Sequence, residues 1–246
     1  MLKTLILTDL SREICEELEV MRNPACFEVE VVAAELGEYL FNDKFEKEFK
    51  AFFDIFNLSE IKFAEFLLSQ CIRLCDESEP THFHFLLVVA FLKVLVINFF
   101  HEYQCFRILY ISNFCLDVLY DRVFGKVFES KEFYDNFKLF CQEFLKRFPP
   151  DTEHREFKDS NDGKYYIDFV EERFNVNSNS FSLNESEVKS FEKHYSLESI
   201  AKREWPILSE KKIAEDAYFD VRKYYSSDCE TCGSKCFNFL NFMNFL

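Results

Sequence analysis

Phenylalanine recurs at helical spacing in two segments of this chain. Between positions 41 and 56 five phenylalanines recur at intervals of three or four residues, and the pattern returns between positions 133 and 148. An α-helix completes a turn in about 3.6 residues, so each segment predicts an amphipathic helix with one apolar stripe against a core. The two stripes are Phe41, Phe45, Phe49, Phe52 and Phe56, and Phe133, Phe137, Phe140, Phe144 and Phe148.

Other segments also favour helices. Ser59 can cap a helix that runs through Cys75, because a serine side chain accepts a hydrogen bond from the free N–H groups of a first turn. Within this helix Cys71 and Cys75 share one face and are expected to pack in the core. Further helices are predicted over Asn113–Phe124, Glu185–Tyr195, Leu197–Trp205 and Ser209–Tyr225.

Three segments instead suggest strands. The segment Cys26–Val32 alternates apolar and acidic residues, which is typical of a half-buried strand. The apolar, β-branched run Cys105–Ile111 suggests a buried strand, with a helical continuation as the alternative. The turn-forming residues Asp159–Gly163 lie between two short segments that are suited to a β-hairpin. The fold class expected from these patterns is α+β, predominantly helical with a few short strands.

Two prolines mark a predicted domain boundary. Pro149-Pro150 must end the preceding helix, because proline lacks the backbone N–H that continues one. We therefore expect a main helical domain with short strands over residues 1–148. Residues 151–246 would form a C-terminal part with a hairpin, helices and an apolar tail, and polar Asn175–Ser186 reads as a mobile linker.

The most apolar stretch, Phe83–Phe100, predicts a buried core helix and not a membrane span. A span needs about 20 predominantly apolar residues, and a lysine such as Lys93 at the middle costs about 2.5–3.5 kcal/mol on insertion. The apolar run at the N-terminus is too short for a secretory signal, and the ten cysteines lack the spacing of a disulfide framework. We therefore expect a cytoplasmic protein without membrane contact.

The charge balance excludes one function class. The chain has 29 Lys and Arg against 44 Asp and Glu, a formal net charge of −15, whereas a free-standing DNA or RNA binder neutralises phosphates with an excess of bases. The chain has four glycines and shows neither a phosphate-binding loop nor a nucleophile motif. We expect no DNA partner, no catalytic residues and a binding protein in place of an enzyme.

One cysteine cluster resembles half of a zinc site. Cys229, Cys232 and Cys236 combine a C-x₂-C turn with a third thiol, the residue type and spacing that bind zinc. A second C-x₂-C pair is absent from the sequence, so the fourth ligand is not placed. The thiols are therefore expected to be inert and the protein to need no cofactor, with structural zinc as the alternative.

The C-terminus carries a small repeat of asparagine and phenylalanine. From Cys236 onward eleven residues lack a charged side chain, and the repeat ends in Asn241, Phe242, Met243, Asn244, Phe245 and Leu246. Two interpretations of this tail are open. The tail either docks on the protein's own core or inserts into a groove of a partner, where asparagine hydrogen-bonds and phenylalanine stacks.

In its phenylalanine- and asparagine-rich composition and its Asn238–Leu246 tail, the chain resembles the ribosome dormancy (hibernation) factors of the microsporidian type. The resemblance implies a non-catalytic, ribosome-binding protein that occupies a tRNA site on idle ribosomes and blocks translation. Its partners would be basic ribosomal proteins, together with rRNA contacted through the tail, with Phe245 and Leu246 in a tRNA-end pocket. The alternative is a helical adaptor or assembly subunit of another cytosolic complex, with structural zinc.

Overall fold

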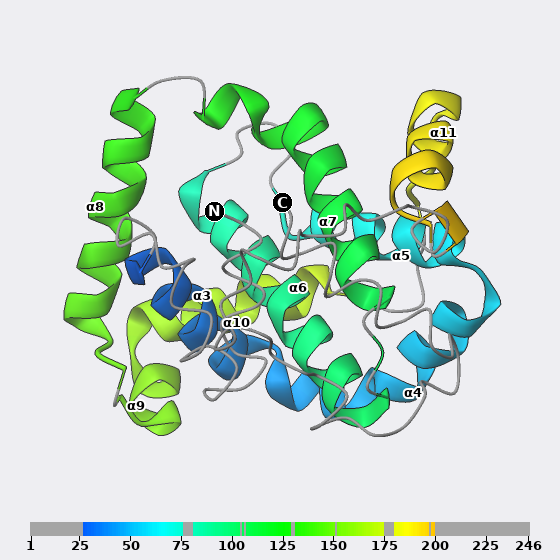
Figure 1. The fold of residues 1–246 in the computed structure, drawn as a ribbon. Helices are drawn as coiled ribbons and strands as arrows, with labels where there is room; N and C mark the ends of the chain where they lie inside the picture. Colours follow the sequence, from blue (N-terminus) through cyan, green and yellow to red (C-terminus); the bar gives the residue numbers. More distant parts are fainter. Residues whose placement is uncertain are drawn as a thin grey trace, which may run out of the picture.

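A computed structural model describes residues 27–75, 81–103, 105, 107–128, 131–150, 152–174, 180–196 and 198–199 of the chain. This part is 86% helical and contains no strand, so the fold is all-α and the expected α+β class is wrong (Figure 1). The elements are α3 (Phe27–Leu40), α4 (Asn42–Leu58), α5 (Glu60–Arg73), α6 (His82–Tyr103), α7 (Arg107–Leu119), the π-helical turn η3 (Tyr120–Phe124), the 3₁₀ turn η4 (Gly125–Phe128), α8 (Lys131–Arg147), α9 (His154–Asp159), α10 (Asn161–Arg173) and α11 (Glu185–His194).

The first predicted strand is the beginning of helix α3. Residues 27–32 of the segment Cys26–Val32 are helical, and Cys26 lies outside the described residues. The alternation that suggested a strand extends over only a few positions. Along all of α3 the buried side chains follow spacings of three and four, which define one helix face. They are Val29, Val32, Ala33, Leu36, Leu40 and their neighbour Tyr39.

The second predicted strand, Cys105–Ile111, is also wrong, and its helical alternative is confirmed. Helix α7 begins at Arg107, and all of its residues except Asp117 are buried. Its residues 108–111 form a short, continuous apolar run, and periodicity cannot distinguish such a run in a buried helix from a buried strand. The buried Arg107 at its start is accommodated because its Nη2 donates to the carbonyl oxygen of Phe56 at 3.1 Å.

The predicted hairpin around Asp159–Gly163 is a junction between two helices. Ser160 caps α10, because its Oγ accepts a hydrogen bond from the Gly163 N–H at 2.9 Å. Gly163 is required for close approach, since a Cβ at this position would lie 1.9 Å from the carbonyl oxygen of Phe157. The turn-forming residues therefore begin a helix and allow α9 to pack closely against it.

Helix α6 lies at the centre of the fold and packs against α3, α4 and α7 (Figure 1). The window His82–Phe99 has a mean hydropathy of 2.0, so α6 is the one described helix that could cross a membrane by length and composition alone. In this fold 83% of that window is buried against other helices, as in the core helix of a soluble protein. The predicted buried helix is confirmed.

The phenylalanine stripes meet in one aromatic core. Phe52 of α4 is fully buried, and its ring lies within 6.4 Å of four other phenylalanine rings, namely Phe45, Phe66, Phe91 and Phe174. A fully buried phenylalanine contributes about 1.5–3 kcal/mol, and each well-oriented ring pair adds about 0.5–1.5 kcal/mol. The stripe of α8 faces the same core through Phe137, Phe144 and Phe148. Both amphipathic helices are therefore confirmed.

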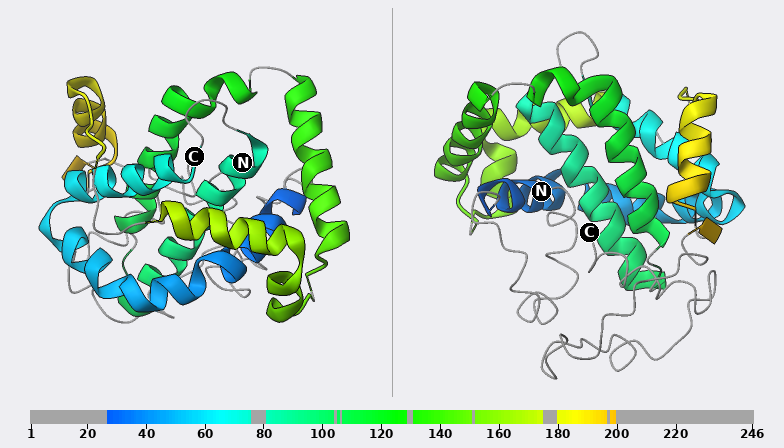
Figure 2. Two further views of the ribbon diagram at one scale, coloured as in Figure 1. Left: turned by 180° about the vertical axis from the view of Figure 1, so that it is seen from behind. Right: turned by 45° about the horizontal axis from the view of Figure 1, so that its top comes forward.

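Helix α8 ends at Arg147, before Pro149-Pro150, as predicted. Beyond the prolines, α9 and α10 pack on α3: the Phe157 ring stacks on Tyr39 at 4.2 Å, and the Tyr39 hydroxyl donates to the carbonyl oxygen of Thr152 at 3.0 Å. The view from behind shows α10 running beside α3 and α4 (Figure 2). Described helices on both sides of the prolines thus share one core. The division into residues 1–148 and 151–246 stays a prediction, because residues 200–246 lie outside the described part.

Residues 180–183, which belong to the predicted linker Asn175–Ser186, pack against α5. The Ser180 N–H donates to Ser69 Oγ, and the Leu183 N–H donates to Glu65 Oε1, both at 3.1 Å. Phe181 between them is buried. We call residues 180–183 the strap, because they fix the beginning of α11 to the helical body. Interpreting this part of the segment as a mobile linker was wrong.

Candidate functional site

The residues that the sequence singled out as site residues lie outside the described part of the chain. This holds for the tail residues Asn241, Phe242, Met243, Asn244, Phe245 and Leu246 and for the thiols of Cys229, Cys232 and Cys236. Their roles stay predictions. Among the described residues, no group of three or more His, Cys, Asp or Glu side chains is arranged to hold a metal ion.

The described cysteines are packing residues. Cys71, Cys75, Cys105, Cys115 and Cys141 are all buried. Burial raises the pKa of the Cys71 and Cys115 thiols, and it raises the pKa of Cys141 to about 12. A thiol is nucleophilic as its thiolate, so these groups are inert at neutral pH. The interpretation of Cys71 and Cys75 as core residues is confirmed.

The surface around α11 is the best candidate for an interaction site. This helix stands at the edge of the molecule, beside α5 and α7 (Figures 1 and 2). Phe191 is its only buried residue. The helix is therefore held by a few specific contacts, which leave hollows at its base.

At its beginning, α11 is held by a bidentate ion pair. Arg122 of η3 donates from Nε to Glu187 Oε1 at 2.7 Å and from Nη2 to Glu187 Oε2. Glu187 also completes a capping box with Asn184, in which each side chain accepts from the other residue's backbone N–H. One carboxylate thus closes the first turn of α11 and ties it to η3.

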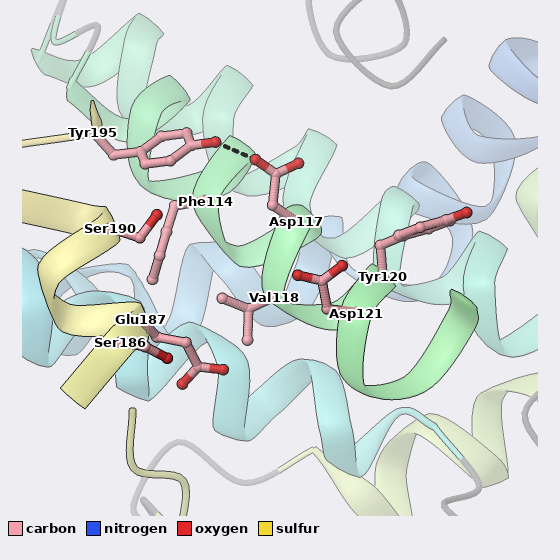
Figure 3. A pocket seen from close by; sticks show the side chains of 9 residues that line it. All are labelled: Phe114, Asp117, Val118, Tyr120, Asp121, Ser186, Glu187, Ser190 and Tyr195. Carbon is pink, nitrogen blue, oxygen red and sulfur yellow. Dashed lines mark hydrogen bonds between the residues drawn. The ribbon is translucent and has the colours of Figure 1, made fainter. Parts of the chain in front are cut away.

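The end of α11 is held by aromatic contacts and one hydrogen bond. The Phe191 ring meets Phe114 of α7 edge-on at 4.9 Å, and the Tyr195 ring lies 5.4 Å from Phe114. The Tyr195 hydroxyl donates to Asp117 Oδ2 (Figure 3). Asp117 is the residue of α7 that is not buried, so this contact uses the only exposed position that α7 offers.

A first groove, which we call the α7 groove, lies between these two attachments. It has a volume of about 390 Å³. Phe114 and Val118 form an apolar floor, and Asp117, Asp121 and Glu187 add carboxylates to the walls (Figure 3). The remaining lining residues are Tyr120, Ser186, Ser190 and Tyr195. The groove therefore combines an acidic rim with aromatic surface.

The π-helical turn η3 shapes one wall of the α7 groove. The Gly125 N–H bonds to the carbonyl oxygen of Tyr120, five residues earlier, so the turn is wider than in an α-helix. Phe124 turns into the core while Arg122 faces α11, where its guanidinium also lies over the Phe181 ring at 4.5 Å. Single π-helical turns of this kind are frequent at functional sites.

A second groove, the α5 groove, lies on the neighbouring face of α11. It has a volume of about 550 Å³ and includes Ser59, Glu60 and Ile61 at the beginning of α5. From α11 and the residues that follow it come Phe191, Glu192, Ser196, Glu198 and Ser199. Its charged lining residues are all acidic, as in the α7 groove. Acidic grooves with apolar floors suit cationic side chains that have aliphatic stems.

Comparison with known proteins identifies no relative. No family model matches the chain, and searches of curated proteins and of solved structures found no match.

Sequence analysis missed the two grooves. Asp117 lies in α7 and Asp121 four residues later in η3, but carboxylates are abundant in this acidic chain and this pair has no distinguishing neighbour in the sequence. The partners that build the site, Glu187 and Tyr195, are more than 60 residues away along the chain. The capping pattern of Asn184 and Glu187 is the one local signal, and it identifies a helix start but not a site.

Proposed function

We propose that the chain is a non-catalytic ribosome-binding protein that occupies a tRNA site on idle ribosomes and blocks translation. Its acidic helical body would dock on basic ribosomal proteins, and its uncharged C-terminal tail would enter an rRNA pocket. The ribosome as partner follows from the resemblance in composition and tail. The separate binding roles of the body and the tail follow from the distribution of charge.

That distribution is the observation that carries the proposal. Residues 200–246 contain seven Lys and Arg and seven Asp and Glu, so the net charge of −15 belongs to residues 1–199. The eleven residues from Cys236 onward carry no charged side chain. A negative body is repelled by phosphates and attracted by basic proteins, whereas an uncharged Asn- and Phe-rich tail can stack and hydrogen-bond without either effect.

Co-sedimentation with ribosomes tests the proposal. The full chain should travel with ribosomes from quiescent cells, and removal of Asn241–Leu246 should abolish this while shifting the free energy of unfolding by less than about 1 kcal/mol. A matched control replaces the exposed Leu58 and Leu139 of the body by serine, which removes apolar surface elsewhere. A truncated chain that still binds ribosomes but melts many degrees lower would show that the tail belongs to the protein's own core.

Salt dependence separates protein contacts from phosphate contacts. With 29 Lys and Arg against 44 acids, the chain can neutralise few phosphates, so its ribosome affinity should fall only weakly with salt. A log–log slope equivalent to about six or more phosphate contacts would contradict the proposal.

Purification of the native complex distinguishes the proposed function from the adaptor alternative. We expect ribosomes to be the companion. A different cytosolic complex, together with one zinc ion per chain held by Cys229, Cys232 and Cys236, would identify the helical adaptor instead.

A further inference from the structure

The protein binds two of its own arginines with the same pair of groups, a carboxylate and an aromatic ring. Arg122 is held by Glu187 and lies over Phe181 at 4.5 Å. Arg107 lies over the Phe56 ring at 3.8 Å, with its Nε 3.9 Å from Glu60 Oε1. Glu187 lines the α7 groove and Glu60 lines the α5 groove, so each groove borders one of these internal guanidinium sites.

The α7 groove presents the same combination to solvent. Asp121 makes no hydrogen bond or ion pair with a described residue, and Tyr120 beside it is 46% exposed. Tyr195 adds a partly exposed ring, whereas Phe114 and Val118 beneath it are only 2% and 5% exposed (Figure 3). A lysine or arginine side chain could lay its aliphatic stem along the Tyr120 ring and place its charge beside Asp121. The exposed tyrosine ring is a second feature, independent of the carboxylates, that selects a cation.

The α5 groove offers carboxylates and an aliphatic side chain on the neighbouring face of α11. Ile61 is partly exposed, whereas Phe191 is only 1% exposed, and the carboxylates include Glu192. Residues 186, 187 and 190 of α11 face the first groove, whereas residues 191 and 192 face the second. Since only one helix separates them, a short extended segment with several basic side chains could use both grooves.

The charge of the chain argues for a partner as the occupant. The protein's own residues 200–246 carry as many acids as bases and offer no net attraction to an acidic groove. A second copy, with its net charge of −15, would be repelled. We propose that the two grooves beside α11 bind the lysine and arginine side chains of a basic segment in a partner protein. This deepens the proposed function by naming the chemistry that the acidic body recognises.

Peptide binding to the full-length protein tests this inference separately from the ribosome. The probe is a fluorescein-labelled, twelve-residue peptide of alternating lysine and glycine, with the glutamate–glycine peptide as the negative probe. The groove variant is Asp121→Lys with Glu192→Lys. The matched control, Asp135→Lys with Glu172→Lys, makes the same change in net charge at exposed positions on α8 and α10. Circular dichroism should give all three proteins the same helix content.

Fluorescence polarisation should show that the groove variant binds the lysine peptide about tenfold more weakly than the control variant, the change expected for about 1.4 kcal/mol of lost contact. Equal affinity of the two variants would overturn the inference, since the peptide would then sense only the overall charge. Ribosome co-sedimentation is measured on the same samples. If peptide binding depends on the grooves but the protein does not co-sediment with ribosomes, the proposed function is rejected and this inference is retained.

Zero-length carbodiimide cross-linking identifies the occupant. With the lysine peptide present, Asp121 and Glu192 should couple to the peptide. Coupling of either carboxylate in the free protein to Lys202, Lys211 or Lys212, or to a second copy of the chain, would assign the grooves to the protein itself and overturn the proposal.

Discussion

Helices α7 and α11 touch each other and are opposites in burial. All residues of α7 except Asp117 are buried, whereas Phe191 is the only buried residue of α11. The two exceptions lie at the same contact, where Phe191 and Tyr195 meet Phe114 and Asp117. Helix α7 is held by packing on every side, so it can move only if the core opens. Helix α11 is held by the strap, two aromatic rings, one hydrogen bond and one ion pair, so it can detach without disturbing the core.

The helices that stabilise the fold therefore differ from the helix that borders the candidate site. The aromatic core around α4, α6 and α7 supplies the free energy of folding, and the lightly attached α11 borders both grooves that could bind a partner. Surface ion pairs contribute only about 0–1 kcal/mol each, and a bidentate geometry raises this modestly. The candidate site therefore borders a described helix that has little buried surface.

A rise in pH should lower the free energy of unfolding more than any single substitution, because it acts on several buried thiols at once. Burial raises the pKa of Cys71, Cys115 and Cys141 in the folded state. Above a pH of about 9 the unfolded chain loses these protons while the folded protein keeps them, so stability falls as the pH rises. Urea unfolding between about pH 8 and pH 10.5 should show this fall, and Cys141→Ala should make it less steep. Stability that is constant over this range would contradict the burial of these thiols.

Removal of one core ring should have the largest effect among single substitutions. Phe52→Ala deletes a ring that packs against four other phenylalanines and should cost about 3–5 kcal/mol in the free energy of unfolding. Leu58→Ala in the same helix is the control, since Leu58 is 78% exposed and its loss should change stability by less than about 0.5 kcal/mol. Chemical denaturation measures both. Similar costs at the two positions would mean that α4 does not face the core as described.

A methyl group at the α9–α10 junction should have an intermediate effect. Gly163→Ala places a Cβ against the carbonyl oxygen of Phe157, so the junction must open and the cost should be about 1–3 kcal/mol. Gly125→Ala is a milder comparison, because the nearest atom to its Cβ would lie 3.1 Å away. Thermal melting of the two variants should rank Gly163→Ala as the less stable. The reverse order would contradict the close approach of α9 and α10.

Loss of the cap on α11 should have the smallest effect on global stability. Asn184→Ala removes the side chain that accepts from the Glu187 N–H, which typically costs a helix about 1 kcal/mol. The helix should fray while the melting temperature of the core hardly changes, because α11 opens locally. Lys193→Ala, at an exposed position in the same helix, is the control. A fall in the core melting temperature as large as that of Gly163→Ala would show that α11 is part of the core.

Helices with a long periodic stripe or a long apolar run could be predicted from the sequence, whereas helices that contain a short alternating or short apolar segment could not. The stripes of α4 and α8 have one apolar face, so their period of three and four residues is visible in the sequence. Helix α7 has almost no exposed face, and its continuous apolar run resembles a strand. The residues Asp159–Gly163 resemble a turn because Ser160 caps a helix and Gly163 permits close packing, and both residue types are also common in turns.

The candidate site could not be predicted because its parts come from distant positions. The ion pair of Arg122 with Glu187 and the hydrogen bond of Tyr195 with Asp117 join segments that local patterns treat separately. The acidic net charge favours a basic partner, which stays a prediction. It did not indicate where on the surface a carboxylate lies beside an exposed tyrosine ring.

Hydrogen exchange, read segment by segment in the intact protein, tests the contrast between α7 and α11 most directly. The account predicts that amides of Glu185–His194 exchange at least about a hundredfold faster than those of α6 and α7, which corresponds to a gap of about 3 kcal/mol in opening free energy. It also predicts that Phe191→Ala accelerates exchange in α11 and leaves α6 and α7 unchanged. Equal protection of α11 and α7, or a loss of protection in α7 when Phe191 is removed, would contradict the account.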